Sequence, residues 1–293
     1  MFDYLAEQIP YQTLIKTAHL QLDVKRLDLI HPDISGNKFF KLKENFKQAR
    51  LQGLKQILTF GGAFSNHIAA TAAACQQFGF KSVGIIRGEE LAHQPLNTTL
   101  AQAQKAGMHL HFVSRQTYRQ RHNAQYQHDV FTQFPNSYLI PEGGTNALAV
   151  LGCQDILNHD DLEQYDFIAA AVGTGGTLAG LIEKSRPHQQ ILGFSALKGD
   201  FLQHDIQQWT PKTNWSLTDA FCCGGYAKTT PELLAFMQQF EHQYQIPLEQ
   251  VYTAKMFYGL FQLIEHAYFK PNCRILAIHS GGLQGRLALI NPL

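Results

Sequence analysis

The stretch Ser35-Gly36-Asn37-Lys38-Phe39-Phe40-Lys41-Leu42 joins a predicted strand to a predicted helix. Before it, residues 20–30 alternate apolar and polar side chains, which is typical of a strand. After it, apolar side chains recur at helical spacing from Phe39 to Ala49. Lys38 is therefore expected at the start of a helix, after a glycine that allows the backbone to turn sharply.

Two roles are open for Lys38 at this position. It is either a solvated residue at a helix start or a lysine that forms a Schiff base. The second role suits lysine chemistry, because a desolvated lysine loses its proton readily and its neutral amine attacks carbonyl carbons. A Schiff-base lysine needs a phosphate site, a site for a substrate carboxylate and a partner for a cofactor ring. The rest of the chain can be searched for these three.

The composition and charge limit the number of domains and the class of partner. The 293 residues suffice for one large domain or two ordinary ones, and 45% hydrophobic residues are enough for a substantial core. The formal charge of +1 gives no support for a nucleic acid or an acidic membrane as a partner. No apolar run is long enough to span a bilayer.

The cysteines and the first residues predict a cytoplasmic protein without a metal site. Five cysteines without CxxC spacing are expected to be reduced thiols. The amino-terminal residues 1–7 are acidic where a signal peptide would be basic. His109 and His111 share a face of a probable strand, but no third ligand accompanies them, so no metal is predicted.

Strand-like and helix-like segments alternate nearly throughout the chain. Among them, residues 108–113 and 137–140 are predicted strands, and residues 118–133 and 231–244 are predicted helices. This alternation predicts an α/β fold with mostly parallel sheets and helices on both faces. Ligands bind such sheets at the carboxyl ends of strands. Four candidates directly follow predicted strands: Lys38, Ser65, the segment 173–177 and Ser280.

The segment Gly173-Thr174-Gly175-Gly176-Thr177 lies between a predicted buried strand and a helix. Its backbone N–H groups are suited to a phosphate, which the helix dipole also favours. It is not a dinucleotide fingerprint, because Leu178 stands where the third glycine is required. A tight turn without a ligand remains the alternative.

The segment Gly61-Gly62-Ala63-Phe64-Ser65-Asn66-His67 is a second glycine-rich helix start. Ser65 and Asn66 are good N-cap residues, and capping alone would explain them. The same geometry would bind a substrate carboxylate and present the Ser65 hydroxyl to the reacting centre.

Two tyrosines are candidates for acid–base chemistry. Tyr226 follows two glycines, and Tyr252 precedes a predicted helix. Loop tyrosines are usually half-buried packing residues. A phenol beside a cationic cofactor would instead have a lowered pKa and could transfer a proton.

Taken together, these segments resemble a known family. Gly36-Asn37-Lys38, followed by Lys41-Leu42, resembles the cofactor-lysine motif of pyridoxal-phosphate enzymes of the tryptophan synthase β type. The 61–67 segment is similar to the G-G-x-x-S-N segment of one branch, the 1-aminocyclopropane-1-carboxylate deaminase and D-cysteine desulfhydrase family. The 173–177 segment resembles its phosphate loop. Val251-Tyr252 and His279-Ser280-Gly281-Gly282 match its late active-site segments, in the family order. The resemblance extends from Leu22 to the end of the chain.

The resemblance implies a fold type II architecture of two three-layer α/β/α domains with mostly parallel sheets. Residues 1–44 and 142–293 would form a larger domain that binds pyridoxal 5'-phosphate. Residues 45–141 would form a smaller inserted domain, with the cofactor between the two. A homodimer is expected.

The resemblance also assigns roles to individual residues. Lys38 would carry the cofactor, Ser65 would be the active-site serine, and Asn66 would contact the ring oxygen. Tyr226 and Tyr252 would be the two active-site tyrosines. The remaining residues expected to bind the cofactor are Gly173, Thr174, Gly175, Gly176, Thr177, Thr253 and Ser280.

Thr253 and Ser280 bear on the reaction. Family members that open a cyclopropane ring resemble one another in having Glu and Leu here, whereas desulfhydrase-type members carry hydroxyl residues. A carboxylate beside the pyridine nitrogen keeps the ring protonated and a strong electron sink. A neutral hydroxyl does so much less, and suits the elimination of a good leaving group such as thiolate.

The expected reaction is therefore the α,β-elimination of a small amino acid, D-cysteine first, to pyruvate, sulfide and ammonia. The enamine formed on the way hydrolyses, so the labels lyase, deaminase and hydrolase are all expected. Alternatives are deamination of 1-aminocyclopropane-1-carboxylate or of another small D-amino acid, and binding of pyridoxal phosphate or an amino acid without turnover. A nicotinamide-dependent dehydrogenase is a remote further alternative.

Overall fold

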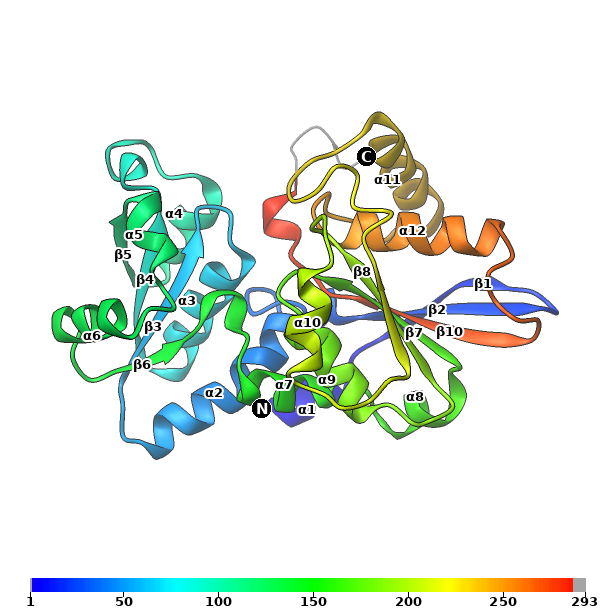
Figure 1. Ribbon diagram of the computed structural model, residues 1–293, viewed down its shortest axis with the longest axis horizontal. Coiled ribbons are helices and arrows are strands. Elements are labelled where there is room, and N and C mark those ends of the chain that lie inside the picture. The colour runs from blue at the N-terminus through cyan, green and yellow to red at the C-terminus, as the bar shows by residue number, and fades with distance from the viewer. Residues whose placement is uncertain (1, 287–293) are drawn as a thin grey trace.

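The computed structural model describes residues 2–286 and contains two sheets that lie in separate lobes (Figure 1). The larger sheet has six strands in the order β1-β2-β10-β7-β8-β9. β1 pairs antiparallel with β2, and all other neighbours in this sheet are parallel. The strands are β1 (Tyr11–Lys16), β2 (Leu20–Arg26), β7 (Phe167–Val172), β8 (Gln190–Ser195), β9 (Trp215–Thr218) and β10 (Cys273–His279).

The smaller sheet has four parallel strands in the order β5-β4-β3-β6. All four come from the part of the chain between β2 and β7, so the smaller sheet is an insertion into the larger one. Its strands are β3 (Gln56–Gly62), β4 (Lys81–Arg87), β5 (Met108–Val113) and β6 (Ser137–Ile140).

Helices cover both faces of both sheets. The α-helices are α1 (Phe2–Glu7), α2 (Asn37–Leu51), α3 (Asn66–Phe78), α4 (Thr98–Lys105), α5 (Arg115–Arg119), α6 (Ala124–Gln133), α7 (Ala147–Gln154), α8 (His159–Gln164), α9 (Gly176–Lys184), α10 (Phe201–Gln207), α11 (Pro231–Tyr244) and α12 (Thr253–Glu265). Short 3₁₀ turns are η1 (Leu27–Leu29), η2 (Glu89–His93), η3 (Glu142–Gly144) and η4 (Leu283–Gly285).

The central strand β7 shows why the sequence reads as a buried apolar run. Ile168 and Ala170 pack on one face of the sheet, in a cluster with residues of α2, α7 and α9. Ala169 and Ala171 pack on the opposite face, in a cluster with residues of α11 and α12. Figure 1 shows the latter two helices together on one side of the sheet. Burial of a parallel sheet on both faces requires apolar residues at every position.

The smaller sheet is covered in the same way. Leu58 and Val83 pack with Tyr118 of α5 and Val130 of α6, whereas residues of α3 and α4 form a separate cluster. The predicted fold class, two three-layer α/β/α units with mostly parallel sheets, is confirmed. The boundaries 1–44, 45–141 and 142–293 stay a prediction, and α2 runs through position 44.

Details of the elements differ from the sequence pattern in a few places. The helical pattern at 118–133 is two helices, α5 and α6, because the Asn123 side chain accepts a hydrogen bond from the Tyr126 N–H and starts a new helix there. The five cysteines are free thiols. Within residues 2–286, no helix has the length and apolar character needed to cross a membrane.

Candidate active site

Lys38 lies in the first turn of α2, which follows η1 after the connecting residues 30–36. Its neighbour Asn37 joins three loops: the backbone N–H donates to the Ser280 carbonyl at 3.1 Å, and the side-chain amide donates to the Thr177 hydroxyl at 2.8 Å. The Lys38 amine donates to the Asn37 side-chain oxygen at 3.2 Å. A Cβ atom at Gly36 would lie 1.9 Å from the Ser280 carbonyl oxygen, so this approach needs glycine. The structure therefore brings Lys38, the 173–177 loop and Ser280 together.

Lys41 lies one helical turn after Lys38 and faces the same loops. Its ammonium donates to the Gly143 carbonyl at 3.0 Å, to the Thr145 hydroxyl at 2.9 Å and to the Thr174 hydroxyl at 3.2 Å. Its side chain is buried. The sequence analysis included Lys41 in the motif but assigned it no role. The i to i+3 spacing from Lys38, which places both on one helix face, was the available signal.

The 173–177 loop connects β7 to α9. Gly175 is the N-cap of α9 with φ at 80°, and α9 begins at Gly176. The first backbone N–H groups of a helix have no partner within it and carry partial positive charge. With the Lys41 ammonium beside Thr174, they form a site suited to a phosphate.

The 61–67 loop connects β3 to α3. Ser65 is the N-cap of α3, and its hydroxyl accepts a long hydrogen bond of 3.3 Å from the Ile68 N–H. The Asn66 side-chain oxygen and His67 Nδ1 are buried without a partner among the described residues. Gly282 lies against the Asn66 amide, which joins this loop to the segment after β10. Buried polar atoms without a partner are unfavourable, so this loop is arranged for a polar group from outside the chain.

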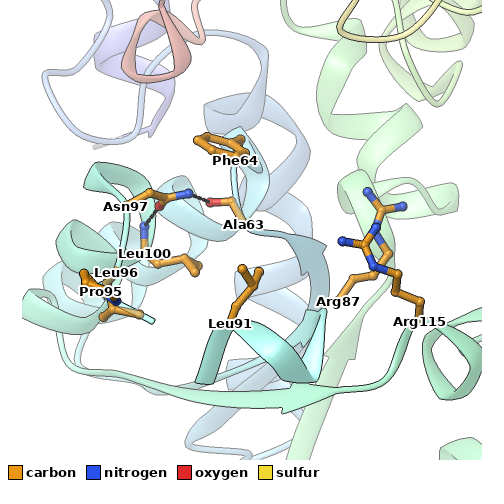
Figure 2. A pocket seen from close by; sticks show the side chains of 9 residues that line it. All are labelled: Ala63, Phe64, Arg87, Leu91, Pro95, Leu96, Asn97, Leu100 and Arg115. Atoms are coloured by element: carbon orange, nitrogen blue, oxygen red, sulfur yellow. Dashed lines mark hydrogen bonds between the residues drawn. The ribbon is translucent and has the colours of Figure 1, made fainter. Parts of the chain in front are cut away.

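A hollow of about 280 Å³ flanks the 61–67 loop, and Ala63 and Phe64 are among the residues that line it (Figure 2). The Asn97 amide donates to the Ala63 carbonyl at 3.0 Å, and its oxygen accepts from the Leu100 N–H at 2.9 Å. Neither Lys38 nor Ser65 lines this hollow, and it meets the 61–67 loop through Ala63 and Phe64.

The two tyrosines lie side by side. The rings of Tyr226 and Tyr252 are 6.2 Å apart, centre to centre, at 64°. Tyr252 packs on Gly173, where a Cβ atom would lie 2.9 Å from its ring. Burial, and then the neighbouring Tyr226, raises the pKa of Tyr252 well above its ordinary value. In the chain alone Tyr252 is therefore held as a neutral phenol, a proton donor, and lowering its pKa would need the cationic cofactor.

Thr253 and Ser280 differ in what their hydroxyls do. Thr253 is fully buried, and its hydroxyl accepts a hydrogen bond from the Glu249 N–H at 3.0 Å. Ser280 is half-buried, and its hydroxyl forms no hydrogen bond with any other described residue. Of the two, Ser280 has the hydroxyl that is free for a ligand.

Glu249 is a site neighbour that the sequence reasoning missed. Its carboxylate accepts hydrogen bonds from the backbone N–H groups of Val251, Tyr252 and Thr253, at 2.7, 2.7 and 2.6 Å. It therefore caps the start of α12, and burial raises its pKa. A glutamate three residues before Tyr252, ahead of an apolar helix, was the only signal in the sequence.

Burial shifts the basic groups of the site toward their neutral forms. It lowers the pKa of Lys38 to about 8. Burial, and then repulsion from Lys38, lowers the pKa of Lys41 to about 7. Burial and the two lysines together hold the pKa of His67 well below its usual range. The site thus offers a nucleophilic amine near neutral pH and gains from an anion placed among these groups.

The geometry agrees with a family match along nearly the whole chain. A family model described as pyridoxal-phosphate dependent enzyme matches residues 9–281. The chain belongs to this family. Its cofactor is pyridoxal 5'-phosphate, and it is an enzyme of the branch that contains 1-aminocyclopropane-1-carboxylate deaminases and D-cysteine desulfhydrases.

The names of individual relatives include both activities of this branch, the deaminase and the desulfhydrase. A putative 1-aminocyclopropane-1-carboxylate deaminase of Thermotoga maritima is 31% identical over 290 residues, with 90% of this chain and 89% of the relative covered. A mitochondrial bifunctional D-cysteine desulfhydrase/1-aminocyclopropane-1-carboxylate deaminase of Arabidopsis thaliana is 29% identical over 303 residues, covering 90% and 73%. The crystal structure of an ACC deaminase homologue superposes with a TM-score of 0.75 at 24% identity, over 97% of this chain and 95% of the other, which shows a shared fold.

These relatives correct one expectation from the sequence. The label hydrolase is wrong, because the relatives are deaminases and desulfhydrases of a pyridoxal-phosphate family. In lyase chemistry the bond at the β-carbon breaks by elimination, and water acts only on the product that is released.

Proposed function

We propose that this protein catalyses the α,β-elimination of a small D-amino acid, D-cysteine first. D-cysteine and one water give pyruvate, sulfide and ammonia. The observation that carries the proposal is the pair of neutral hydroxyls at Thr253 and Ser280. The nearby Glu249 carboxylate is directed at the N–H groups that start α12, so it is engaged by the backbone.

The residues of the site fit pyridoxal 5'-phosphate. The Lys38 amine would bind it covalently, and a pKa of about 8 leaves part of this amine neutral at pH 7. Lys41, Thr174 and the first N–H groups of α9 would hold the phosphate. The side-chain amide N–H group of Asn66 would donate to the ring oxygen, and the Ser280 hydroxyl would contact the ring nitrogen. When bound, the cofactor supplies electron withdrawal from the substrate Cα.

The substrate would lie over the 61–67 loop. The start of α3, with N–H groups unsatisfied within the helix, suits the substrate carboxylate. The Lys38 amine, when it is not bonded to the cofactor, would accept the Cα proton, and Ser65 would orient the reacting centre. Tyr252, kept neutral by burial, or its neighbour Tyr226, would give a proton to the leaving thiolate.

Deamination of 1-aminocyclopropane-1-carboxylate is the second candidate. The name of the Thermotoga relative favours it, whereas the name of the Arabidopsis relative contains both activities. It requires opening an unactivated ring, which a carboxylate beside the ring nitrogen would assist. Neither Thr253 nor Ser280 provides that carboxylate, so D-cysteine is placed first.

The test is a substrate panel on the reconstituted enzyme. D-cysteine, L-cysteine, D-serine, β-chloro-D-alanine and 1-aminocyclopropane-1-carboxylate are assayed for 2-oxo acid, and the cysteines also for sulfide. We expect the highest kcat/KM with D-cysteine. Release of 2-oxobutyrate from the cyclopropane substrate at a higher kcat/KM would establish the second candidate. A cofactor band that shifts with amino acids, but yields no 2-oxo acid from any of them, would mean binding without turnover.

Two further proposals concern the protein's state. We propose a cytoplasmic location, which the five unpaired thiols support. We propose a homodimer, which light scattering of the purified protein tests.

A further inference from the structure

The loop between β9 and α11 presents Tyr226 and has an unusual backbone. Cys223, Gly224, Gly225 and Ala227 all have positive φ, at 50°, 89°, 109° and 55°. Two of these four are not glycine, and non-glycine residues rarely adopt this conformation. Tyr226 itself is half-exposed, so burial of its ring does not fix the loop. Something outside the loop has to hold it in this shape.

The buried Lys255 is attached to this loop. It lies on α12 three residues after Tyr252, and its side chain is only 1% exposed. Its ammonium donates to the Gly225 carbonyl at 2.7 Å, directly before Tyr226. Among residues 2–286 it forms no ion pair, although Cys223, Cys222 and Glu249 face it closely enough to oppose the effect of burial, which lowers its pKa.

An ammonium group in this position is costly for the fold. Removing a charge from water is unfavourable, and an apolar side chain of similar length would pack at lower cost. The loop also contacts α12 through an apolar side chain, because Phe221 packs on Gly259, one turn after Lys255. Lys255 adds a polar attachment next to Tyr226.

We propose that Lys255 is a positioning residue that fixes Tyr226 beside Tyr252. Tyr252 is the N-cap of α12, and Lys255 lies in its first turn. The hydrogen bond from Lys255 to the Gly225 carbonyl therefore fixes the position of the Tyr226 loop relative to Tyr252. The two rings, 6.2 Å apart, then act as one proton-donating unit for the leaving group. This role rests on the proposed elimination reaction.

The kinetic test uses Lys255→Met, which removes the ammonium and keeps the apolar stem. With the reconstituted enzyme and D-cysteine we expect kcat to fall about tenfold, the KM to change less than twofold, and the absorbance band of the bound cofactor to be unchanged. Lys228→Met removes an exposed lysine from the same loop and is the matched control, with kcat within twofold of wild type. An unchanged kcat in Lys255→Met would overturn the proposal.

A double-mutant cycle separates positioning from a general structural role. If Lys255 acts through Tyr226, Lys255→Met has almost no further effect on kcat in a Tyr226→Phe background. The same tenfold loss in both backgrounds would show that Lys255 acts elsewhere. If Lys255→Met does not fold, Lys255→Gln, which keeps a donor without the charge, takes its place in the cycle.

Limited proteolysis tests the attachment without any turnover. Trypsin cleaves after Lys228, within the loop. We expect cleavage there to be about tenfold faster in Lys255→Met than in wild type, with other sites unchanged. Equal rates would overturn the attachment. Faster cleavage together with no elimination activity in the wild type would instead retain the attachment and reject the proposed reaction.

Discussion

The two glycine-rich loops of the site, 173–177 and 61–67, have the same local structure. They differ in whether their polar side chains have hydrogen-bond partners. Each follows a parallel strand and starts a helix. In the first, Thr174 is hydrogen-bonded to Lys41, and Thr177 to Asn37. In the second, the Asn66 oxygen and His67 Nδ1 are buried without a partner among residues 2–286. We therefore propose that the first loop is a preformed anion site and that a ligand supplies the missing partners of the second.

Lys38 and Lys41 also differ in the number of hydrogen-bond acceptors around their amines. Lys41 has three oxygen acceptors, one of them in the 173–177 loop. Lys38 makes one hydrogen bond, of 3.2 Å, to the Asn37 side-chain oxygen. Both have lowered pKa values, but only Lys38 has a loosely held amine that is free to react.

Lys38→Ala has the largest expected effect. Turnover and the visible band of the covalently bound cofactor should both be abolished, because alanine has no amine. Borohydride treatment followed by mass spectrometry should find no modified peptide at this position. Lys47→Ala, at an exposed position of the same helix, should retain both. Full activity with a retained visible band in Lys38→Ala would place the reactive lysine elsewhere.

Ser65→Ala tests the incomplete loop. We expect kcat to fall on the order of 100-fold with the cofactor still bound, which is typical of a positioned proton-transfer group. Ser114→Ala is the control, because Ser114 caps α5 with the same hydrogen-bond pattern. If Ser65 is only a cap, both variants lose about 1 kcal/mol of stability and keep full activity per folded molecule.

Lys41→Met tests whether Lys41 holds the cofactor phosphate at the 173–177 loop. A hydrogen bond from a charged group contributes about 1.5–3 kcal/mol, which corresponds to about 10- to 100-fold weaker cofactor binding. Titration of the apoenzyme with pyridoxal 5'-phosphate measures the dissociation constant, with Lys47→Met as the control. At saturating cofactor, kcat should stay within a few-fold of wild type. Unchanged affinity would show that Lys41 does not hold the phosphate.

The rate of cofactor attachment should depend on pH through Lys38. The neutral amine is the nucleophile, and its pKa is about 8. The observed rate should therefore fall about tenfold for each pH unit below 8 and level off above it. Stopped-flow absorbance of the apoenzyme mixed with cofactor between pH 6 and 9.5 measures this. A midpoint near 10.5, the ordinary lysine value, would contradict the effect of burial.

Ser280→Ala and Thr253→Val have the smallest expected effects and sharpen the assignment of the ring contact. Loss of one neutral hydrogen bond corresponds to a change of about 2- to 10-fold in kcat for Ser280→Ala, without a change in stability. Thr253→Val should instead lower the free energy of unfolding by about 1 kcal/mol, because it breaks the contact with Glu249, and leave kcat unchanged. The reverse pattern in activity assays and thermal melts would assign the ring contact to Thr253.

The element pattern was largely readable from the sequence where periodicity was strong. The strands Met108–Val113 and Ser137–Ile140 and the helix Pro231–Tyr244 have the predicted bounds. The short elements β1, β9 and α10 were missed, because a few residues do not establish a period and tertiary packing decides their conformation.

For the site, the sequence by itself determined which chemical groups are present. The order of its motifs indicated the pyridoxal-phosphate family, the reactive position of Lys38 and the glycine loops that follow strands. Local patterns carry this information, because a strand, a glycine turn and a helix start are specified by neighbouring residues.

Only the tertiary structure decided how these groups are used. Lys41, Glu249 and Lys255 have no motif that shows their partners, since those partners lie at distant positions of the chain. The lowered pKa of Lys38 and the different surroundings of Thr253 and Ser280 also arise from packing. Burial and long-range hydrogen bonds depend on the assembled fold, and a local sequence pattern does not contain them.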